Sequence, residues 1–278
     1  MAQIKKEKNI IPSFTLNNGI KIPMVGLGVY KIPKGTATQQ AVATAFKLGY
    51  RHIDTAAFYK NEHDVGIAIK KSKISREEIF VTTKLHPLKI FNIEKAFYKS
   101  LKKLDLNYID LYLVHAPFLR KKKVWKTLEE IYQRGHIKAI GVSNYGIKDL
   151  QKLLNIAKII PAVNQVEFHP FLFQKELKDF CQSKNIVLEA HSPLTHGKYI
   201  HHEKIEQLAE KYHKSPAQIL LRWSVQQGNI VIPKTQNPLK MKENINIFNF
   251  SIKKEDVILL NSLNTKKHVA FLSNFEKN

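Results

Sequence analysis

The sequence predicts a closed (β/α)8 barrel, the TIM-barrel fold of the α/β class, with an N-terminal β-hairpin. From residue 25 onward, short apolar runs alternate with stretches whose apolar residues recur every three or four positions. Eight such runs occur, each followed by a helical stretch, which requires a parallel sheet because every crossover must return over the sheet. Eight units in roughly 250 residues fit a closed barrel better than an open sheet. No linker interrupts the pattern, so residues 1–278 are expected to form a single domain.

The hairpin is expected at about residues 13–23, where Phe14–Leu16 and Ile20–Ile22 flank Asn17-Asn18-Gly19. An Asn-Gly pair between two β-forming segments supplies the positive φ angles of a tight hairpin turn. This segment therefore precedes the alternating units and does not belong to them.

Eight β runs follow the hairpin. They are Val25–Leu27, His52–Asp54, Ile79–Lys84, Ile109–His115, Ile137–Val142, Ala162–Glu167, Val187–Ala190 and Ile230–Pro233. An open, doubly wound sheet is disfavoured because Gly26-Leu27-Gly28 lacks the third glycine of a dinucleotide-binding loop, and no Gly-Lys-Ser/Thr phosphate loop exists.

Helices are expected between the β runs. They are Gln40–Leu48, Val65–Lys71, Ile93–Leu104, Val124–Tyr132, Leu150–Ala157, Leu177–Ser183, Ile205–Tyr212 with Pro216–Val225, Met241–Ile247 and Val257–Leu263. Their apolar spacing is that of helices with one buried face.

The charge balance is strongly basic, with 45 Lys and Arg against 23 Asp and Glu, a net charge of +22. Proteins that read nucleic acids rely on arginine for bidentate contacts, whereas the cations here are mostly lysines scattered along the chain. The surplus therefore favours solvated lysine-rich faces over nucleic-acid binding. Attraction of anionic small molecules is the second interpretation.

Composition also indicates a cytoplasmic protein. The single cysteine, Cys181, cannot form an internal disulfide, which is typical of a reducing compartment. No run reaches the roughly 18 apolar residues that would cross a bilayer. The chain starts with the mostly polar segment Met-Ala-Gln-Ile-Lys-Lys-Glu-Lys, and no apolar segment of a signal peptide follows it.

Polar residues stand at nearly every predicted strand end. In a barrel of this type the chemistry lies where strands end and the following loops begin. The residues are Asp54 with Tyr59 beyond it, Lys84, His115, Ser143-Asn144, Gln165 with Glu167, Ser192 and Lys234-Thr235. A purely structural barrel does not need such a set at one edge, so an active site is expected there.

Seven of these segments resemble the aldo-keto reductases, in the order found in that family and from about residue 14 to about residue 264. They are Asp54–Tyr59, Val81–Leu85, Leu104–His115, Gly141–Asn144, Asn164–Pro170, Ser192–Leu194 and Ile232–Thr235. The comparison is nearest to the short prokaryotic branch that includes the 2,5-diketo-D-gluconate reductases. The resemblance implies a reductase that transfers hydride from NADPH to aldehydes or ketones.

The residues at the strand ends suit that reaction. A carbonyl that accepts hydride gains negative charge on oxygen and needs a proton donor, and Tyr59 is expected to be that acid. Lys84 is expected to lower the pKa of Tyr59, since a nearby ammonium favours the phenolate. Asp54 would keep Lys84 charged and in place. His115 would donate a hydrogen bond to the carbonyl oxygen.

The resemblance also implies the cofactor residues. Ser143, Asn144 and Gln165 would hold the nicotinamide carboxamide, and Ser192 and Leu194 the pyrophosphate. Lys234 and Thr235 would contact the adenosine phosphate, and Asn244 the adenine. Lys240 stands where the family often has an arginine that binds the 2′-phosphate, and lysine lacks the bidentate geometry. NADPH is favoured over NADH because no acidic residue that would bind a free ribose hydroxyl is evident.

Four positions depart from the family pattern at the expected pocket. His191 replaces a tyrosine that usually stacks on the nicotinamide. Tyr30, His86 and Ala116 stand where the family commonly has aromatic, mostly tryptophan, walls. The loop from Pro117 to Val124 is short and carries Arg120 and three lysines. The pocket is therefore expected to be wide, polar and basic, and suited to small, polar or anionic carbonyl compounds.

Other functions remain as alternatives. A Schiff-base lyase would use a neutral Lys84 as nucleophile. A regulatory barrel would bind the cofactor without turnover. A metal site is disfavoured because the 12 histidines lack His-Glu-x-x-His spacing, although His191, His196, His201 and His202 lie close in sequence. No nucleic-acid or membrane partner is expected, and the protein is expected to be a monomer or a weak homo-oligomer.

Overall fold

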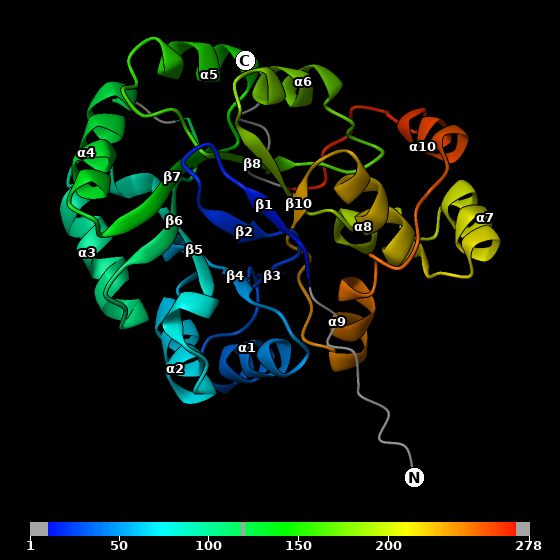
Figure 1. The fold of residues 1–278 in the computed structure, drawn as a ribbon, viewed down its shortest axis with the longest axis horizontal. Helices are drawn as coiled ribbons and strands as arrows, with labels where there is room; N and C mark the ends of the chain where they lie inside the picture. Colours follow the sequence, from blue (N-terminus) through cyan, green and yellow to red (C-terminus); the bar gives the residue numbers. More distant parts are fainter. Residues whose placement is uncertain (1–10, 118–119, 271–278) are drawn as a thin grey trace.

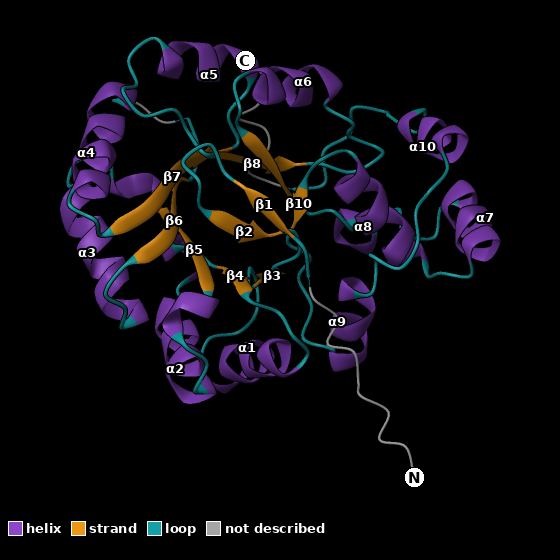
Figure 2. Cartoon of the chain, viewed as in Figure 1, coloured by secondary structure: helices purple, strands orange, loops and turns teal. Residues whose placement is uncertain are grey.

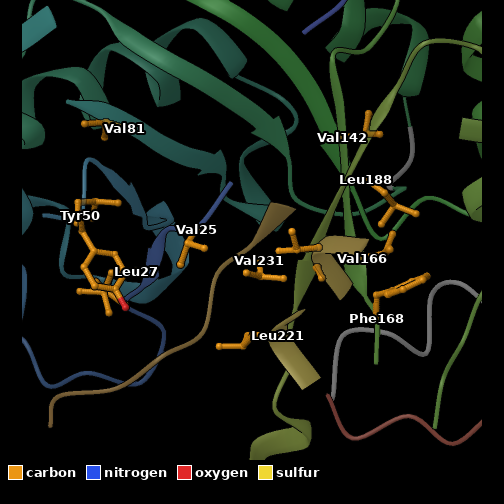
Figure 3. Close-up of a cluster of buried hydrophobic side chains, with 14 of the residues drawn as sticks. Val25, Leu27, Tyr50, Val81, Val142, Val166, Phe168, Leu188, Leu221 and Val231 are labelled. Carbon is orange, nitrogen blue, oxygen red and sulfur yellow. The ribbon is translucent and has the colours of Figure 1, made fainter. Parts of the chain in front are cut away.

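A computed structural model describes residues 11–117 and 120–270 and contains an eight-stranded parallel sheet in the order β10-β9-β8-β7-β6-β5-β4-β3 (Figure 1). A bridge between Val25 and Val231 joins the two ends of this order. Gly26 N–H donates to the Val231 carbonyl at 2.9 Å, and Val231 N–H donates to the Met24 carbonyl at 3.0 Å. These bonds close the sheet into the predicted barrel. Figure 3 shows Val25 and Val231 side by side at this seam.

The strands have the following bounds. They are β1 (Ser13–Thr15), β2 (Lys21–Pro23), β3 (Leu27–Gly28), β4 (His52–Asp54), β5 (Phe80–Leu85), β6 (Ile109–Val114), β7 (Ile137–Ser143), β8 (Val163–Glu167), β9 (Val187–His191) and β10 (Ile230–Val231). Each predicted β run coincides with one of them or overlaps it.

The helices lie outside the sheet (Figure 2). They are α1 (Thr36–Lys47), α2 (Glu62–Ser72), α3 (Ile93–Leu104), α4 (Lys121–Gln133), α5 (Ile147–Leu154), α6 (Lys175–Ser183), α7 (Glu203–Tyr212), α8 (Pro216–Gln226), α9 (Pro238–Ile245) and α10 (Lys254–Asn261). Short 3-10 turns lie at η1 (Ala57–Tyr59), η2 (Arg76–Glu78), η3 (Pro87–Lys89) and η4 (Thr195–Gly197). In Figure 1, α7 and α10 lie farther from the barrel than α8.

The N-terminal hairpin covers one end of the barrel. Strands β1 and β2 pair antiparallel, and Gly19 in their turn has a φ of 85°, as the Asn-Gly sequence predicted. Leu16 and Ile22 are buried in a cluster with barrel residues such as Leu111 and Leu113. The hairpin thus seals this end with apolar side chains, and the other end, where the strands terminate, is left for the site.

Several boundaries differ from the predictions. Strand β3 begins at Leu27, and Val25 before it forms only an isolated bridge with Val231. Strand β10 ends at Val231, ahead of Pro233, which has no N–H to continue the ladder. The predicted loop up to Val124 is wrong in part, since Lys121 to Lys123 form the first turn of α4. Residues 118–119 of that loop and the polar start of the chain lie outside the described residues.

In the two described ranges, no helix combines the length and the apolar character needed to cross a membrane.

Gly28 gives a test of the barrel seam. A Cβ atom at Gly28 would lie 2.7 Å from the Ile232 backbone carbonyl oxygen, so Gly28→Ala must push β3 away from the chain after β10. We expect the free energy of unfolding to fall by about 1–3 kcal/mol, measured by urea denaturation. At a strand position with free space around it, replacing glycine by alanine would instead raise the free energy of unfolding, because alanine loses less conformational entropy on folding. A stabilised Gly28→Ala variant would therefore contradict this close approach.

Candidate active site

The predicted catalytic residues come together at the carboxyl ends of the strands. Asp54 is the last residue of β4, Lys84 is the fifth of six in β5, and His115 directly follows β6. Parallel strands place their ends at the same rim of a barrel, which is why residues far apart in sequence meet there. Tyr59 reaches the same place at the end of η1, the turn that follows β4.

Asp54 and Lys84 form a buried ion pair. Lys84 Nζ lies 2.7 Å from both carboxylate oxygens of Asp54 and donates to the Thr55 carbonyl at 2.9 Å. Neither side chain is more than 2% exposed. Burial by itself would lower the pKa of Lys84, but Asp54, through its charge and its hydrogen bonds, together with Tyr59 and Glu189 outweighs burial, and the pKa lies above its usual value. Burial raises the pKa of Asp54, against the pull of Lys84.

The Tyr59 hydroxyl lies 3.4 Å from Lys84 Nζ, and its ring packs on Tyr30 with ring centroids 4.8 Å apart. The predicted fall in the pKa of Tyr59 is wrong: burial raises it to about 12. Lys84 does pull this pKa downward, but Asp54 cancels part of that effect and desolvation of the phenolate exceeds the remainder. Tyr59 is therefore a fully protonated phenol at neutral pH.

His115 is buried beside Tyr59, with ring centroids 5.9 Å apart and the rings nearly perpendicular. Burial lowers its pKa well below the usual value, and the positive charge of Lys84 acts in the same direction. Its Nδ1 atom is buried without a hydrogen-bond partner in the described part of the chain. His115 is consequently a neutral imidazole at physiological pH.

The three residues assigned to the carboxamide form one hydrogen-bonded group. Asn144 Nδ2 donates to the His115 backbone carbonyl and to Ser143 Oγ, both at 3.0 Å. Ser143 Oγ in turn donates to the Gln165 backbone carbonyl at 2.9 Å. Gln165 Nε2 donates to Asp54 Oδ2 at 2.8 Å, which links this group to the ion pair. Asn144 holds its place with a left-handed φ of 60°, a conformation that asparagine tolerates.

His191 continues the group toward the surface. Its Nε2 lies 3.0 Å from Asn144 Oδ1, and its Nδ1 lies 3.2 Å from Ser192 Oγ, which in turn lies 2.9 Å from His196 Nε2. Burial lowers the pKa of His191 to about 3, so the ring is neutral. Over residues 11–117 and 120–270, no group of three or more His, Cys, Asp or Glu side chains is arranged to hold a metal ion.

The remaining predicted cofactor residues lie on neighbouring elements. Leu194 is half-buried just before η4, and Lys234 and Thr235 follow β10. Lys240 is exposed in the first turn of α9, and Asn244 is buried in the same helix. Within the described residues, no hydrogen bond or ion pair joins them to the Asp54–Lys84 pair. Hydrogen bonds thus link the predicted carboxamide residues to the ion pair, and none of those described links these five residues to it.

The predicted pocket-wall residues lie near Tyr59 and His115. Tyr30 packs on Tyr59, and Ala116 is buried next to His115 along the chain. His86 lies 5.6 Å from Phe58, measured between ring centroids, and Phe58 also packs edge-on against His115 at 6.2 Å. Sequence reasoning missed Phe58, which is 41% exposed and stands directly before Tyr59.

One buried carboxyl group, Glu189, was missed as a site residue, and Glu167, which was expected at this edge of the barrel, was given no role. Glu189 in β9 accepts a hydrogen bond from Gln165 Nε2 at 2.5 Å, although it had been included only in an apolar strand run. Glu167 at the end of β8 lies 3.0 Å from His169 Nε2 and accepts from Val269 N–H at 2.6 Å, and so ties residues 268–270 to the barrel. A charged residue inside an otherwise apolar strand was the signal that could have identified Glu189.

Comparison with known proteins gives matches along most of the chain. The model of the aldo/keto reductase family matches residues 25–265. A glyoxal reductase from Bacillus subtilis is 47% identical over 262 residues, which cover 91% of this chain and 93% of that protein. A crystal structure of an aldo/keto reductase from Brucella melitensis superposes with a TM-score of 0.88 at 42% identity, covering 91% of this chain and all of that one. An aldo-keto reductase from Bombyx mori, solved in complex with NADP, gives 0.90 at 35% identity, covering 96% and 97%.

The ion pair gives a test of the site's electrostatics. Lys84→Met leaves the buried Asp54 carboxyl without its cation, so its pKa must rise further above the unfolded value. A carboxyl group with a raised folded-state pKa favours the folded protein at low pH and loses that contribution as pH rises. We therefore expect the loss of unfolding free energy, about 3 kcal/mol or more at pH 8, to be smaller at pH 5 in urea denaturation.

The control is Lys70→Met, which breaks a pair with Asp105 whose side chains are 79% and 67% exposed. It should change stability little at either pH. Equal losses for Lys84→Met at pH 5 and pH 8 would contradict the buried ion pair.

Proposed function

The chain belongs to the aldo/keto reductase family and is an oxidoreductase, and on this premise we propose that it reduces small, polar or anionic aldehydes and ketones with NADPH, with Tyr59 as the proton donor. The single observation that carries the proposal is the protonated Tyr59 phenol held beside a buried ammonium and a neutral imidazole. These are the groups that a carbonyl oxygen needs when it gains negative charge.

In the proposed mechanism, the neutral His115 donates a hydrogen bond to the substrate carbonyl oxygen and orients it. The bound nicotinamide supplies the hydride. As charge develops on the carbonyl oxygen, Tyr59 donates its proton, which is favourable because an alkoxide is a much stronger base than a phenolate. The Lys84 ammonium, at 3.4 Å, stabilises the phenolate that results, and Asp54 keeps that ammonium charged and fixed.

The amide groups of the site suit a nicotinamide carboxamide. Both hydrogens on Gln165 Nε2 are engaged by carboxyl groups, and both hydrogens on Asn144 Nδ2 are engaged by protein oxygens. Gln165 has its side-chain oxygen left as an acceptor, and Asn144 Oδ1, which lies 3.0 Å from His191 Nε2, has a second lone pair. Both oxygens complement the amino group of a carboxamide. Lys234 and Lys240, both exposed, are proposed to bind the adenosine phosphates, and this favours NADPH over NADH.

Positive charges near His86, one of the predicted pocket walls, support a preference for small polar or anionic carbonyl compounds. Burial lowers the pKa of His86, and the nearby charges of Lys89, Lys60 and Lys103 lower it further. A neutral His86 beside several ammonium groups is a wall that attracts carboxylates and phosphates. The similarity to a glyoxal reductase points in the same direction, toward short carbonyl compounds.

The lyase alternative is disfavoured by the geometry of Lys84. A Schiff-base nucleophile must be neutral and reachable, whereas this amine is fully buried and donates to Asp54 and to the Thr55 carbonyl. A regulatory barrel that binds cofactor without turnover stays an outcome of the experiment below.

Tyr59→Phe tests the proposal. The ring keeps its packing on Tyr30, but the proton donor is gone, so we expect the reduction rate to fall by roughly a hundredfold or more. NADPH oxidation at 340 nm is followed with short aldehydes, dicarbonyls and keto acids, and NADPH binding is titrated separately. Binding should be retained.

Tyr108→Phe is the matched control, since Tyr108 stands just ahead of β6 at the opposite end of the barrel, and its rates should equal those of the unaltered protein. Tight NADPH binding by the unaltered protein with no turnover on any carbonyl would favour the regulatory alternative. Absence of binding would contradict both.

The pH dependence of reduction follows from the Tyr59 pKa of about 12. The acid form is the reactive one, and it predominates at every pH well below that value. We therefore expect kcat for reduction, at saturating NADPH and substrate, to stay level from pH 7 to about pH 10. Because Glu189 has a pKa of about 8, the same profile is measured for Glu189→Gln. A decline with an apparent pKa near 8 or 9 in both proteins would show that a group more acidic than this phenol donates the proton.

A further inference from the structure

Glu189 lies one hydrogen bond away from the proposed nicotinamide site, and no step of the mechanism above uses it. It stands in β9 directly opposite Gln165 in the strand register, and it is fully buried. Its Oε1 atom accepts from Gln165 Nε2 at 2.5 Å, and its Oε2 atom is buried without a hydrogen-bond partner in the described part of the chain. A buried carboxyl group with one unsatisfied oxygen is costly for a fold and calls for an explanation.

Glu189 and Asp54 together fix the orientation of the Gln165 amide. Gln165 Nε2 lies 2.8 Å from Asp54 Oδ2 and 2.5 Å from Glu189 Oε1, so the two carboxyl groups take both of its hydrogens. Turning the amide over would place its carbonyl oxygen against two carboxyl oxygens. The side-chain oxygen of Gln165, Oε1, is thereby left as the atom that can accept a hydrogen bond from a ligand.

We propose that Glu189 is a positioning residue that fixes Gln165 and, through its own ionisation, sets the preference of the site for oxidised over reduced cofactor. This inference rests on the proposed function, because it requires a nicotinamide next to Gln165. The oxidised nicotinamide ring carries a positive charge and the reduced ring carries none. A negative charge on Glu189 therefore attracts only the oxidised form.

The surroundings of Glu189 decide when that charge is present. Asp54 faces it from β4 and Lys84 from β5, while Gln165 in β8 is uncharged and Ile230 and Val231 in β10 are apolar. Burial raises the pKa of Glu189 to about 8, and the Asp54 charge adds to this rise, whereas Lys84 and the Gln165 hydrogen bond oppose it. The group is thus mostly neutral at pH 7 and ionised at pH 9.

Four other buried groups of the site that the structure describes keep their charge in this interval. The pKa of His191 is about 3 and that of His115 lies well below its usual value, while the pKa of Tyr59 is about 12 and that of Lys84 lies above its usual range. Because solvent does not reach Glu189, its charge is weakly screened by salt. Burial raises the pKa of Asp54 as well, but Asp54 has Lys84 Nζ at 2.7 Å from both of its oxygens, whereas Glu189 has no cation in contact among the described residues. We therefore assign a pH-dependent cofactor preference between pH 7 and 9 to Glu189.

The test compares cofactor affinities of the full-length protein and its Glu189→Gln variant. Glutamine keeps the acceptor for Gln165 Nε2 but cannot ionise. Dissociation constants of NADP+ and NADPH are measured by calorimetry at pH 6.5, 7.5, 8.5 and 9.5, and the ratio of the two is taken at each pH. Both cofactors carry the same 2′-phosphate, so its titration cancels in the ratio.

In the unaltered protein we expect the ratio to shift toward NADP+ by roughly fivefold between pH 6.5 and 9.5. In Glu189→Gln we expect a constant ratio. The matched control is Glu129→Gln, in which a buried carboxylate that accepts from the Lys158 and Ile159 backbone N–H groups is neutralised away from the site. Its ratio should follow the unaltered protein even if its stability falls, as checked by thermal denaturation.

Three results would overturn the inference: a ratio independent of pH in the unaltered protein, a shift that persists in Glu189→Gln, or a shift abolished equally by Glu129→Gln. If the unaltered protein binds neither cofactor, the proposed function fails as well, and this distinguishes the two failures. A Glu189→Gln variant that does not fold is replaced by Glu189→Asp, which retains an ionisable group and should retain a shift; a constant ratio there would also contradict the inference.

Discussion

The burial of Lys84 with Asp54 is the constraint on which the rest of the site depends. An ammonium with no exposure is tolerable only if its hydrogens are engaged and its charge is balanced, and both conditions are met by Asp54 and the Thr55 carbonyl. This requirement fixes the ends of β4 and β5 relative to each other. The turn that carries Tyr59 begins three residues after Asp54, so the short segment that follows β4 places the Tyr59 phenol next to the Lys84 ammonium.

The hydrogen bonds of Asp54 extend this constraint across the barrel. Gln165 joins Asp54 to Glu189, and so links β4 to β8 and β9 through side chains in the barrel interior. The carboxyl groups of Asp54 and Glu189 and the ammonium of Lys84 are then buried together, away from water, where the charge of each strongly shifts the pKa values of the others. The consequences are a phenol that stays protonated, an imidazole that stays neutral and a glutamic acid that titrates near pH 8.

Much of this could be predicted from the sequence, and the failures have identifiable causes. The alternation of apolar runs and helical stretches predicted the barrel, and the Asn-Gly pair predicted the hairpin that closes one end of it. The loop before Val124 was predicted to be longer than it is, because a run of lysines lacks the apolar spacing that indicates a helix. In the structure Lys121 begins α4 and pairs with Asp149. The pKa of Tyr59 was predicted in the wrong direction because charge was considered without desolvation.

By itself the sequence determined the fold class and the group of Asp54, Tyr59, Lys84 and His115, because parallel strands bring their ends to one rim whatever the details of packing. The tertiary structure alone decided how those groups behave. Burial depth sets the sign of each pKa shift, and no periodicity encodes it. Contacts such as that between Gln165 and Asp54, 111 residues apart, arise only when the barrel closes. That closure is also what brings Glu189 into the site.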